Sequence, residues 1–387
     1  MRRVVITGIG AVTPLGHGFA DSWQAMLRGS QGIGPCGRFT GLKWPYAGEV
    51  RDLDLYERFG RKHCMRYDRF VLLAAMAAEE AVADACISPD ALRTAGVVMG
   101  SSRGGISTLE AAVNSRASAF LMAGTTISMA ASFTSQRLGA RGHVLGISNA
   151  CSSGANALGE AMRLIREGRL DAALAGGAEA PLTPLCIQGY GASGALSRSG
   201  LMRPFDRRRD GFVLSEGAAV LALEEREYAL RRGASIYAEL AGYGNASDAH
   251  HPTEPLGEGQ AVAISSALRD AGLEASDVGL ISAHATSTLK GDSVEAGAIN
   301  IVFGNEPPPV SAIKSMTGHM LAASGAFEAA SAAMSLKHGV ILPTINAEDP
   351  REPLDISASH READISSAIC HSFGFGGVNA VLALRRP

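Results

Sequence analysis

Cys151 is the residue whose type and setting best suit covalent chemistry in this sequence. A short apolar run, Val144 to Ile147, ends just before it, and apolar residues at three-to-four spacing follow from Ala155 onward. This pattern predicts a strand, a tight turn carrying Cys151, and a helix. The free N–H groups and positive dipole end of that helix favour thiolate, so we expect a lowered thiol pKa and a nucleophile useful near neutral pH. A buried, inert cysteine at an ordinary strand–helix junction is the alternative.

Two histidines are candidate partners for this cysteine. His284 follows a predicted strand over 278–283, and His319 follows a second one over 310–313, before a helix that contains Glu328. The carboxyl ends of strands in α/β proteins collect functional groups. Neutral imidazoles in such positions could donate hydrogen bonds to a developing anion near pH 7. Taken singly, each histidine is also compatible with a structural role in a surface loop or near a helix start.

A third feature is the run Ser372-Phe373-Gly374-Phe375-Gly376-Gly377, in which three glycines and two aromatic residues fall within a predicted hairpin. Glycine weakens a strand unless the backbone must adopt unusual angles or approach a ligand closely. The cysteine turn, the two histidines and this hairpin together form a combination that chance packing of a core does not readily generate.

The elements that must position these residues alternate between strands and helices. In the first part of the chain, strands are expected at 3–10, 95–99, 172–175 and 212–224. Helices are expected from about Phe19 and over 67–85. The stretch 39–66 is expected to be irregular, and the stretch up to Ala140 is poorly periodic. From 236 the pattern restarts, with strands at 236–243, 278–283 and 310–313, helices at 258–271, 293–303 and 325–338, and a hairpin around 372–378. We therefore expect an α/β fold of two pseudo-duplicated halves, 1–235 with the nucleophile and 236–387 with the two histidines and the hairpin.

Composition narrows the class of protein. The 387 residues are 46% hydrophobic and 19% charged, which is typical of a large globular protein. The net charge of -3 gives no overall basis for binding nucleic acid or an anionic membrane. The six cysteines lack metal-ligand spacing and the sequence has no long apolar segment. We expect a cytoplasmic protein with reduced thiols, no metal, no nucleic-acid partner and no membrane insertion.

The motifs in combination resemble the elongating β-ketoacyl-acyl-carrier-protein synthases, type II-like condensing enzymes of the thiolase superfamily. The resemblance rests on Asn-Ala-Cys151-Ser-Ser-Gly, Ala-His284-Ala-Thr-Ser-Thr, Lys314-Ser-Met-Thr-Gly-His319 and Ser-Phe-Gly-Phe375-Gly-Gly, and it extends over essentially the whole chain. It implies a thiolase-like fold with αβαβα layers, usually as a homodimer. It also implies decarboxylative Claisen condensation of an acyl thioester with a malonyl thioester.

The same resemblance implies roles for individual residues. Cys151 would hold the acyl chain, and His284 and His319 would stabilise the enolate formed from malonyl-acyl-carrier protein; which histidine activates the carboxylate or a water stays open. Lys314 and Glu328 would support His319. The backbone N–H groups of Cys151 and Phe375 would bind the tetrahedral oxyanion.

Further residues are expected to bind substrate or the carrier protein. Thr286 and Thr288 match threonines that contact the pantetheine arm, and Arg103 and Phe373 are further candidates for substrate binding. Because the carrier is acidic, a local basic patch should face it. The candidates for this patch are Arg61, Lys62, Arg66 and Arg203. No organic cofactor is implied, since phosphopantetheine arrives with the carrier.

Three related classes compete with this interpretation. A degradative thiolase would need a second catalytic cysteine, and Cys370 does not fall at the Phe375 turn. A chain-initiating synthase would carry asparagine where this chain has His319. A catalytically silent chain-length partner would lack the nucleophile, whereas this chain retains Cys151.

Four positions depart from the pattern of the resembled family. Asn149 replaces a commoner threonine, Ala285 a usual glycine and His371 an asparagine. Arg103 occupies a position where fatty-acid enzymes often place a hydrophobic residue that lines the acyl pocket. We therefore hypothesise fatty-acid elongation or a specialised polyene or polyketide pathway, with a chain-length-factor-like subunit as a possible heterodimer partner.

Overall fold

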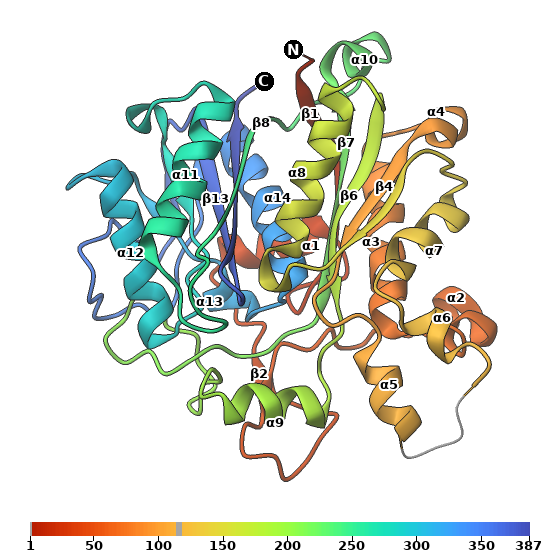
Figure 1. Cartoon of the computed structure of the whole chain (residues 1–387), viewed down its shortest axis with the longest axis horizontal. Coiled ribbons are helices and arrows are strands. Elements are labelled where there is room, and N and C mark those ends of the chain that lie inside the picture. The colour runs from red at the N-terminus through yellow and green to blue at the C-terminus, as the bar shows by residue number, and fades with distance from the viewer. Residues whose placement is uncertain (1, 114–117) are drawn as a thin grey trace.

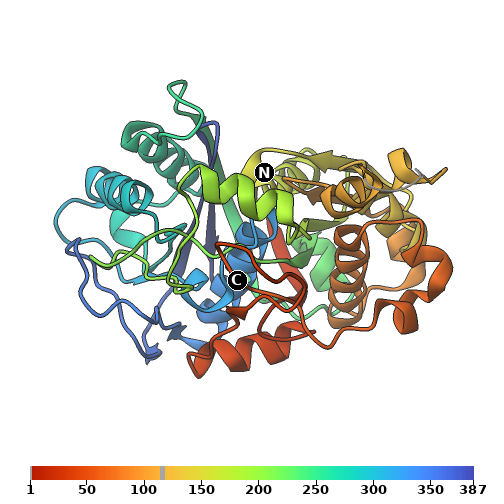
Figure 2. The same cartoon turned by 90° about the horizontal axis from the view of Figure 1, so that it is seen from below.

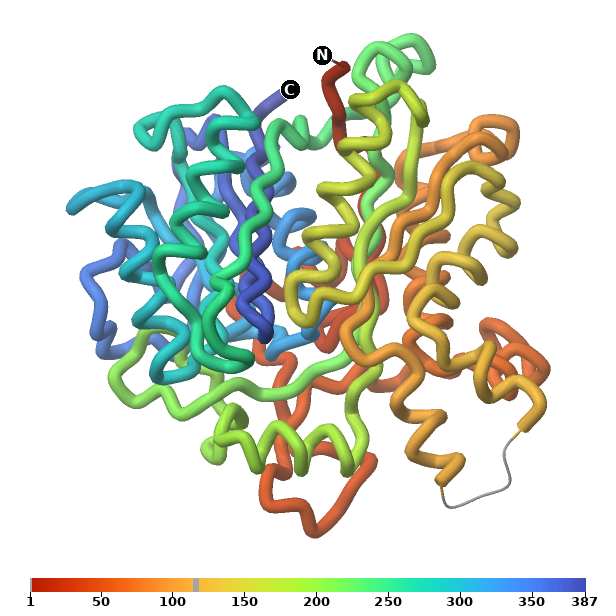
Figure 3. Tube along the Cα trace, in the orientation of Figure 1, coloured from red at the N-terminus to blue at the C-terminus, as the bar shows by residue number. Residues whose placement is uncertain are grey.

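A ten-stranded sheet runs through the computed structural model, which describes residues 2–113 and 118–387. Its strands are β1 (Val4–Val12), β4 (Gly96–Gly100), β5 (Val144–Ile147), β6 (Ala172–Glu179), β7 (Gly217–Glu225), β8 (Ala238–Ser247), β9 (Leu280–Ser282), β10 (Val310–Ser311), β13 (Ser367–Gly374) and β14 (Val378–Arg385). Their order across the sheet is β10-β9-β13-β14-β8-β1-β7-β6-β4-β5. Figure 3 shows the first five strands of this order, β10 to β8, on one side of the molecule and the other five on the opposite side.

The two halves of the sheet have the same topology. Within each half, the five strands are numbered first to fifth along the chain. From the outer edge of the sheet to its centre, they lie in the order third, second, fourth, fifth, first. In both halves the fifth strand is antiparallel to the first and fourth, and the second is parallel to the third and fourth. A short antiparallel contact between β1 and β8 joins them. The expected pseudo-duplication is therefore confirmed, while a domain boundary at 235 stays a prediction.

Helices complete a layered arrangement (Figures 1 and 2). The helices α8 (Ser153–Arg166) and α14 (Ala322–His338) lie in the middle and contact strands of both halves. On the outer faces, α3 (Arg69–Asp84) and α7 (Met129–Leu138) cover the first half and α11 (Gly257–Ala271), flanked by α12 (Leu289–Phe303), covers the second. This is the αβαβα order of a thiolase-like fold.

Small residues bring the outer helices close to the sheet at matching points of the two halves. A Cβ atom added at Gly10 of β1 would lie 2.0 Å from the carbonyl oxygen of Ala77 in α3, and one added at Gly244 of β8 would lie 2.0 Å from that of Ala263 in α11. Side chains are therefore excluded at both contacts. The alanine and glycine content follows in part from this close packing.

Several sequence predictions need correction. The stretch 39–66 contains α2 (Leu55–Cys64), which is kinked at Gly60 and buries only Phe59, so its periodicity is weak. The stretch before Ala140 contains α5 (Ile106–Val113), α6 (Leu121–Thr125) and α7; residues 114–117 lie outside the described residues. The strand predicted from Phe212 begins only at Gly217, because Phe212 and Leu214 form isolated bridges to Leu196 and His319 instead.

The remaining elements are short or connect the layers. They are α1 (Phe19–Leu27), α4 (Pro89–Thr94), α9 (Pro184–Ala192), α10 (Arg226–Arg231), α13 (Lys314–Thr317), the 3-10 turns η1 (Ala150–Ser152) and η2 (Ala275–Asp277), and the strands β2 (Gly34–Pro35), β3 (Tyr46–Ala47), β11 (Val340–Ile341) and β12 (Arg361–Glu362). Over the two described ranges, every helix is too short or too polar to cross a membrane.

Candidate active site

Cys151 lies on η1, in the tight turn between β5 and α8. The turn places Ala150 at a positive φ of 49° and is held by several local hydrogen bonds. The backbone N–H of Asn149 donates to Ser153 Oγ at 2.8 Å, and the hydroxyl of Ser152 donates to the Asn149 carbonyl at 2.7 Å. The predicted strand, turn and helix around the cysteine are confirmed.

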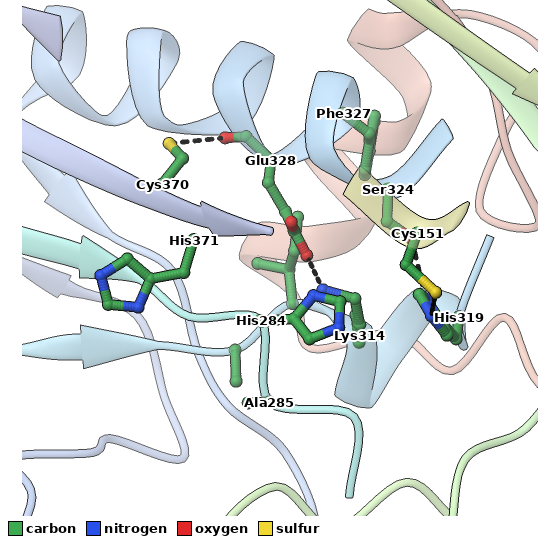
Figure 4. Close-up of polar contacts among 12 residues, drawn as sticks. Cys151, His284, Ala285, Lys314, His319, Ser324, Phe327, Glu328, Cys370 and His371 are labelled. Carbon is green, nitrogen blue, oxygen red and sulfur yellow. Dashed lines mark hydrogen bonds and ion pairs between the residues drawn. The ribbon is translucent and has the colours of Figure 1, made fainter. Parts of the chain in front are cut away.

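His319 contacts the cysteine directly: its Nε2 lies 3.1 Å from Cys151 Sγ (Figure 4). The other ring nitrogen, Nδ1, lies 3.3 Å from Ser324 Oγ, which also accepts the backbone N–H of Met320 at 3.0 Å. Because that oxygen already accepts one bond, its own hydrogen is free to donate to Nδ1. With Ser324 as the donor to Nδ1, we assign the ring proton of neutral His319 to Nε2, which faces the sulfur.

His284 lies beside His319, with ring centroids 5.4 Å apart and ring planes nearly perpendicular. Its backbone N–H donates to Glu295 Oε1 at 2.8 Å, and the ring centroid of Phe373 lies 5.9 Å away. His284 is 8% exposed. The two predicted histidines and Cys151 therefore come together from separate halves of the chain.

Lys314 and Glu328 form an ion pair in the interior, each 1% exposed, as the dashed line in Figure 4 marks. Burial raises the pKa of Glu328 to about 7, and the charge of Lys314 opposes this increase. Burial, with Lys314 as a further cause, lowers the pKa values of His284 and His319 well below their ordinary range. Both imidazoles are therefore neutral at pH 7, and each can donate a hydrogen bond without adding a buried positive charge.

The expected lowering of the cysteine pKa is wrong. Burial raises the pKa of the Cys151 thiol to about 11, although the positive charge of Lys314 and a hydrogen bond from the Phe375 backbone N–H both act to lower it. Desolvation of a thiolate in this closed turn outweighs the helix end and the nearby charge. The resting sulfur is protonated, and its thiolate must be stabilised as the reaction proceeds.

The glycine-rich hairpin brings Phe375 against this turn. A Cβ atom at Gly374 would lie 2.9 Å from the Asn149 carbonyl oxygen, so only glycine fits there without displacement. Gly376 and Gly377 adopt positive φ angles of 87° and 70°. The Phe375 N–H thus donates a hydrogen bond to Cys151 Sγ, and its predicted role in binding an oxyanion stays a prediction.

A cavity of about 320 Å³ leads from the surface to the sulfur. Its walls contain the predicted residues Cys151, His284, His319, Thr286, Thr288, Phe373 and Phe375. The hydroxyl oxygens of Thr286 and Thr288 lie 3.2 Å apart, and Thr288 also caps α12 by accepting the Gly291 N–H at 3.2 Å. The same threonine therefore has a structural role in addition to its place in the cavity wall.

Sequence reasoning missed two aromatic residues of this cavity, Tyr190 and Phe212. Phe212 packs edge-on to His319 with centroids 5.2 Å apart, and Tyr190 packs edge-on to Phe212 at 5.5 Å. Phe212 belongs to the conspicuous run Asp210-Gly-Phe-Val-Leu-Ser-Glu-Gly, so a signal was present. Tyr190 lies on α9, an unpredicted helix with no amphipathic pattern.

Arg103 does not line this cavity. Its guanidinium carbon lies 5.4 Å from the centroid of the Tyr190 ring, and its positive charge acts to lower the pKa of the Cys151 thiol. The predicted role of Arg103 in substrate binding stays a hypothesis. Because Arg103 lies outside the cavity wall, we interpret this role as an indirect one, through Tyr190.

The four basic candidates for carrier binding do not form one patch within the chain. Arg61 and Lys62 are exposed on α2, and Arg66 lies over the Phe120 ring at 4.5 Å. Arg203 instead donates its backbone N–H to Ser287 Oγ, near the start of α12. The helices α2 and α12 occupy opposite sides of the molecule in Figures 1 and 2.

Two family models match nearly the whole chain. The model "Beta-ketoacyl synthase, N-terminal domain" matches residues 1–229, and "Beta-ketoacyl synthase, C-terminal domain" matches 237–348. The chain belongs to the beta-ketoacyl synthase family. The family identification from the sequence motifs is thereby confirmed.

Named beta-ketoacyl synthases resemble the chain over its full length. The 3-oxoacyl-acyl-carrier-protein synthase 2 of Vibrio harveyi is 40% identical over 409 aligned residues, covering 100% of this chain and 99% of the relative. The ishigamide ketosynthase/chain length factor has a TM-score of 0.95 at 35% identity, covering 100% and 99% of the two chains. A type II polyketide ketosynthase bound to its hexaketide, in complex with its acyl-carrier protein, has a TM-score of 0.91 at 34% identity, covering 100% of each.

In residues 2–113 and 118–387, no three His, Cys, Asp or Glu side chains gather closely enough to hold an ion. Cys370, the other cysteine considered for catalysis, is buried on β13 with its sulfur 3.8 Å from the Glu328 carbonyl oxygen and does not line the cavity.

Proposed function

We infer that the chain catalyses decarboxylative Claisen condensation of an acyl thioester, held on Cys151, with malonyl-acyl-carrier protein. The observation that carries this conclusion is the placement of Cys151 Sγ 3.1 Å from His319 Nε2, beside His284 and the Phe375 amide. The named relatives are synthases of this reaction class, so the silent chain-length partner is not favoured.

The first half-reaction loads the enzyme. Cys151 sulfur attacks the carbonyl carbon of the acyl-carrier thioester, and the N–H groups of Cys151 and Phe375 would receive the charge on oxygen. The bond from carbon to the carrier sulfur then breaks, and the carrier leaves as a thiol with the proton that Cys151 gives up. The Nε2–H of His319 stabilises the developing thiolate, which burial otherwise disfavours.

The second half-reaction forms the new carbon–carbon bond. Malonyl-carrier loses carbon dioxide, and the electron pair of the broken bond becomes an enolate whose oxygen accepts hydrogen bonds from His284 and His319. The enolate carbon attacks the acyl group on Cys151. The carbon–sulfur bond breaks, releasing β-ketoacyl-carrier and a thiolate that regains a proton from water.

The neutrality of the two imidazoles fits this sequence of steps. Their pKa values are held low by burial and by Lys314, so their N–H groups bind the enolate without introducing two buried positive charges. The positive charge of Lys314, which is paired with Glu328, is the group that acts on both histidines and on Cys151.

The carrier, the oligomer and the pathway are further parts of this proposal. An acyl-carrier protein presents both substrates on phosphopantetheine, and no other cofactor takes part. We propose a homodimer. The alternative is a heterodimer with a chain-length-factor-like subunit, and similarity to the ishigamide ketosynthase/chain length factor supports this alternative. The proposed carrier contacts remain Arg61, Lys62, Arg66 and Arg203. The first three would form one part of the docking surface, near α2, and Arg203 would form a separate part, near α12.

Mass spectrometry tests the covalent step. Incubation with acyl-carrier should add the acyl mass to the peptide containing Cys151, and malonyl-carrier should then remove it with release of β-ketoacyl-carrier. Cys151→Ala should abolish the adduct, whereas Cys186→Ala, which changes another buried thiol near the cavity, should retain it. Wild-type protein that gains no mass on Cys151 contradicts the proposed function.

A further inference from the structure

Ala285, one of the positions that depart from the family pattern, adopts a left-handed backbone conformation with φ 30°. A residue with a Cβ atom is strained there, and glycine is not. Glu295 compensates by accepting two successive backbone N–H bonds. Its Oε1 accepts that of His284 at 2.8 Å and its Oε2 that of Ala285 at 2.7 Å. The carboxylate therefore fixes the strained turn that carries a catalytic histidine.

His371, a second departure, holds this carboxylate from the other side. Its Nδ1 lies 2.9 Å from Glu295 Oε1. Because both oxygens already accept backbone bonds, we assign the shared proton to Nδ1. His371 and Glu295 are 0% and 1% exposed, so water does not substitute for either partner. The two unusual residues, His371 and Ala285, thus meet at one carboxylate.

The ring of His371 makes a second connection to His284. Its centroid lies 5.2 Å from that of Phe373, which in turn lies 5.9 Å from His284. His371 itself does not line the cavity, and Figure 4 shows it on the strand behind His284. His371 therefore acts on the reaction from outside the cavity, through its contacts with Glu295 and Phe373 and through its electrostatic effect on His284.

We propose that His371 is a positioning residue for the condensation step. Through Glu295 it fixes the strained turn at His284 and Ala285, and thereby the direction of the His284 ring toward the enolate oxygen. The proposal rests on the proposed function, because it assigns His284 to the second half-reaction. It predicts that loss of His371 affects condensation and leaves acyl loading of Cys151 intact.

Two rates measured on the full-length protein test the proposal. Acyl loading is followed by the mass of the Cys151 peptide, and condensation by β-ketoacyl-carrier released from preloaded enzyme. His371→Leu, which removes the donor at similar volume, should lower condensation about tenfold with loading unchanged. His371→Asn should lie close to wild type, because asparagine Nδ2 occupies the place of histidine Nδ1.

The strained turn supplies an internal control. In an Ala285→Gly background the turn no longer needs the carboxylate, so adding His371→Leu should cost less than threefold in condensation. If His371→Leu does not fold, Glu295→Gln takes its place, since an amide cannot accept from both backbone N–H groups. Equal loss of loading and condensation, no loss of either, or an unchanged cost in the Ala285→Gly background overturns the proposal. Wild-type enzyme that fails to load Cys151 contradicts the proposed function instead.

Discussion

His319 Nε2 and Cys151 Sγ lie 3.1 Å apart although 168 positions separate the two residues in the sequence. One residue comes from the end of β5 and the other from the segment after β10, strands at opposite edges of the ten-stranded sheet. The pairing depends on α8 and α14, which bring both turns to the centre. The contact is a property of the duplicated fold as a whole.

Replacing His319 should affect both half-reactions unequally. His319→Ala removes the N–H that faces the sulfur and the enolate, so condensation should fall by about 10²- to 10³-fold. Acyl loading should fall less, because the backbone N–H groups remain. Stopped-flow assays of the two steps would measure the difference. Ser324→Ala, which removes the hydroxyl that contacts the ring and accepts the Met320 N–H, should have a smaller effect in the same direction. Loading that falls as far as condensation would contradict the assignment.

Glu179 gives a pH-dependent prediction for stability. Its Oε1 accepts bonds from Ser101, Ser102 and Arg103, but Oε2 lacks a partner among the described residues. Burial raises the pKa of this carboxyl from 4.5 to about 7. The folded state therefore retains the proton that the unfolded chain releases, and stability decreases as pH rises from 4.5 to 7.

The variant Glu179→Gln should remove this dependence. At pH 8 its free energy of unfolding should exceed that of wild type by about 3 kcal/mol, and near pH 4.5 the two should be similar. Chemical denaturation at several pH values would measure the difference. Glu306→Gln, a change on the exposed surface, should show no such trend. A wild-type advantage that grows toward pH 8 would show that the carboxylate form is favoured.

The sequence predicted the chemistry of the site better than its surroundings. Cys151, His284 and His319 could be found because each follows a short apolar strand, after which the chain must turn. Tyr190 was missed because α9 has no apolar periodicity, and α2 because a single buried residue and a kink leave no helical pattern. The raised thiol pKa of Cys151 could not be predicted either, since it depends on desolvation by residues distant in sequence.

Thr286 and Thr288 should separate substrate binding from stability. Both line the cavity, but only Thr288 caps α12. Replacing either by alanine should raise KM for the acyl-carrier severalfold. Thr288→Ala should also lower the free energy of unfolding by about 1 kcal/mol, whereas Thr286→Ala should leave it nearly unchanged. Steady-state kinetics and thermal unfolding of the two variants check this, and equal destabilisation by both would argue against the cap.

Arg103 should influence acyl selectivity through a series of ring contacts. Its guanidinium lies over Tyr190, Tyr190 packs against Phe212, and Phe212 packs against His319. Burial raises the pKa of Tyr190, so its ring stays neutral and its face remains attractive to the cation. Arg103 therefore restricts the position of a residue that lines the cavity at Cys151.

Replacing Arg103 by isoleucine should release Tyr190 and relax the selectivity of the site. We expect kcat/KM for long saturated acyl-carriers to rise by about threefold to tenfold relative to short or unsaturated ones, since a contact of about 0.5–1 kcal/mol or more is lost. Arg103→Lys, which keeps the charge on a narrower group, should change the ratio less, and Tyr190→Leu should remove the effect of Arg103→Ile. If wild type already prefers long saturated chains and Arg103→Ile leaves the profile unchanged, the specialised pathway loses its support and ordinary fatty-acid elongation becomes the better assignment.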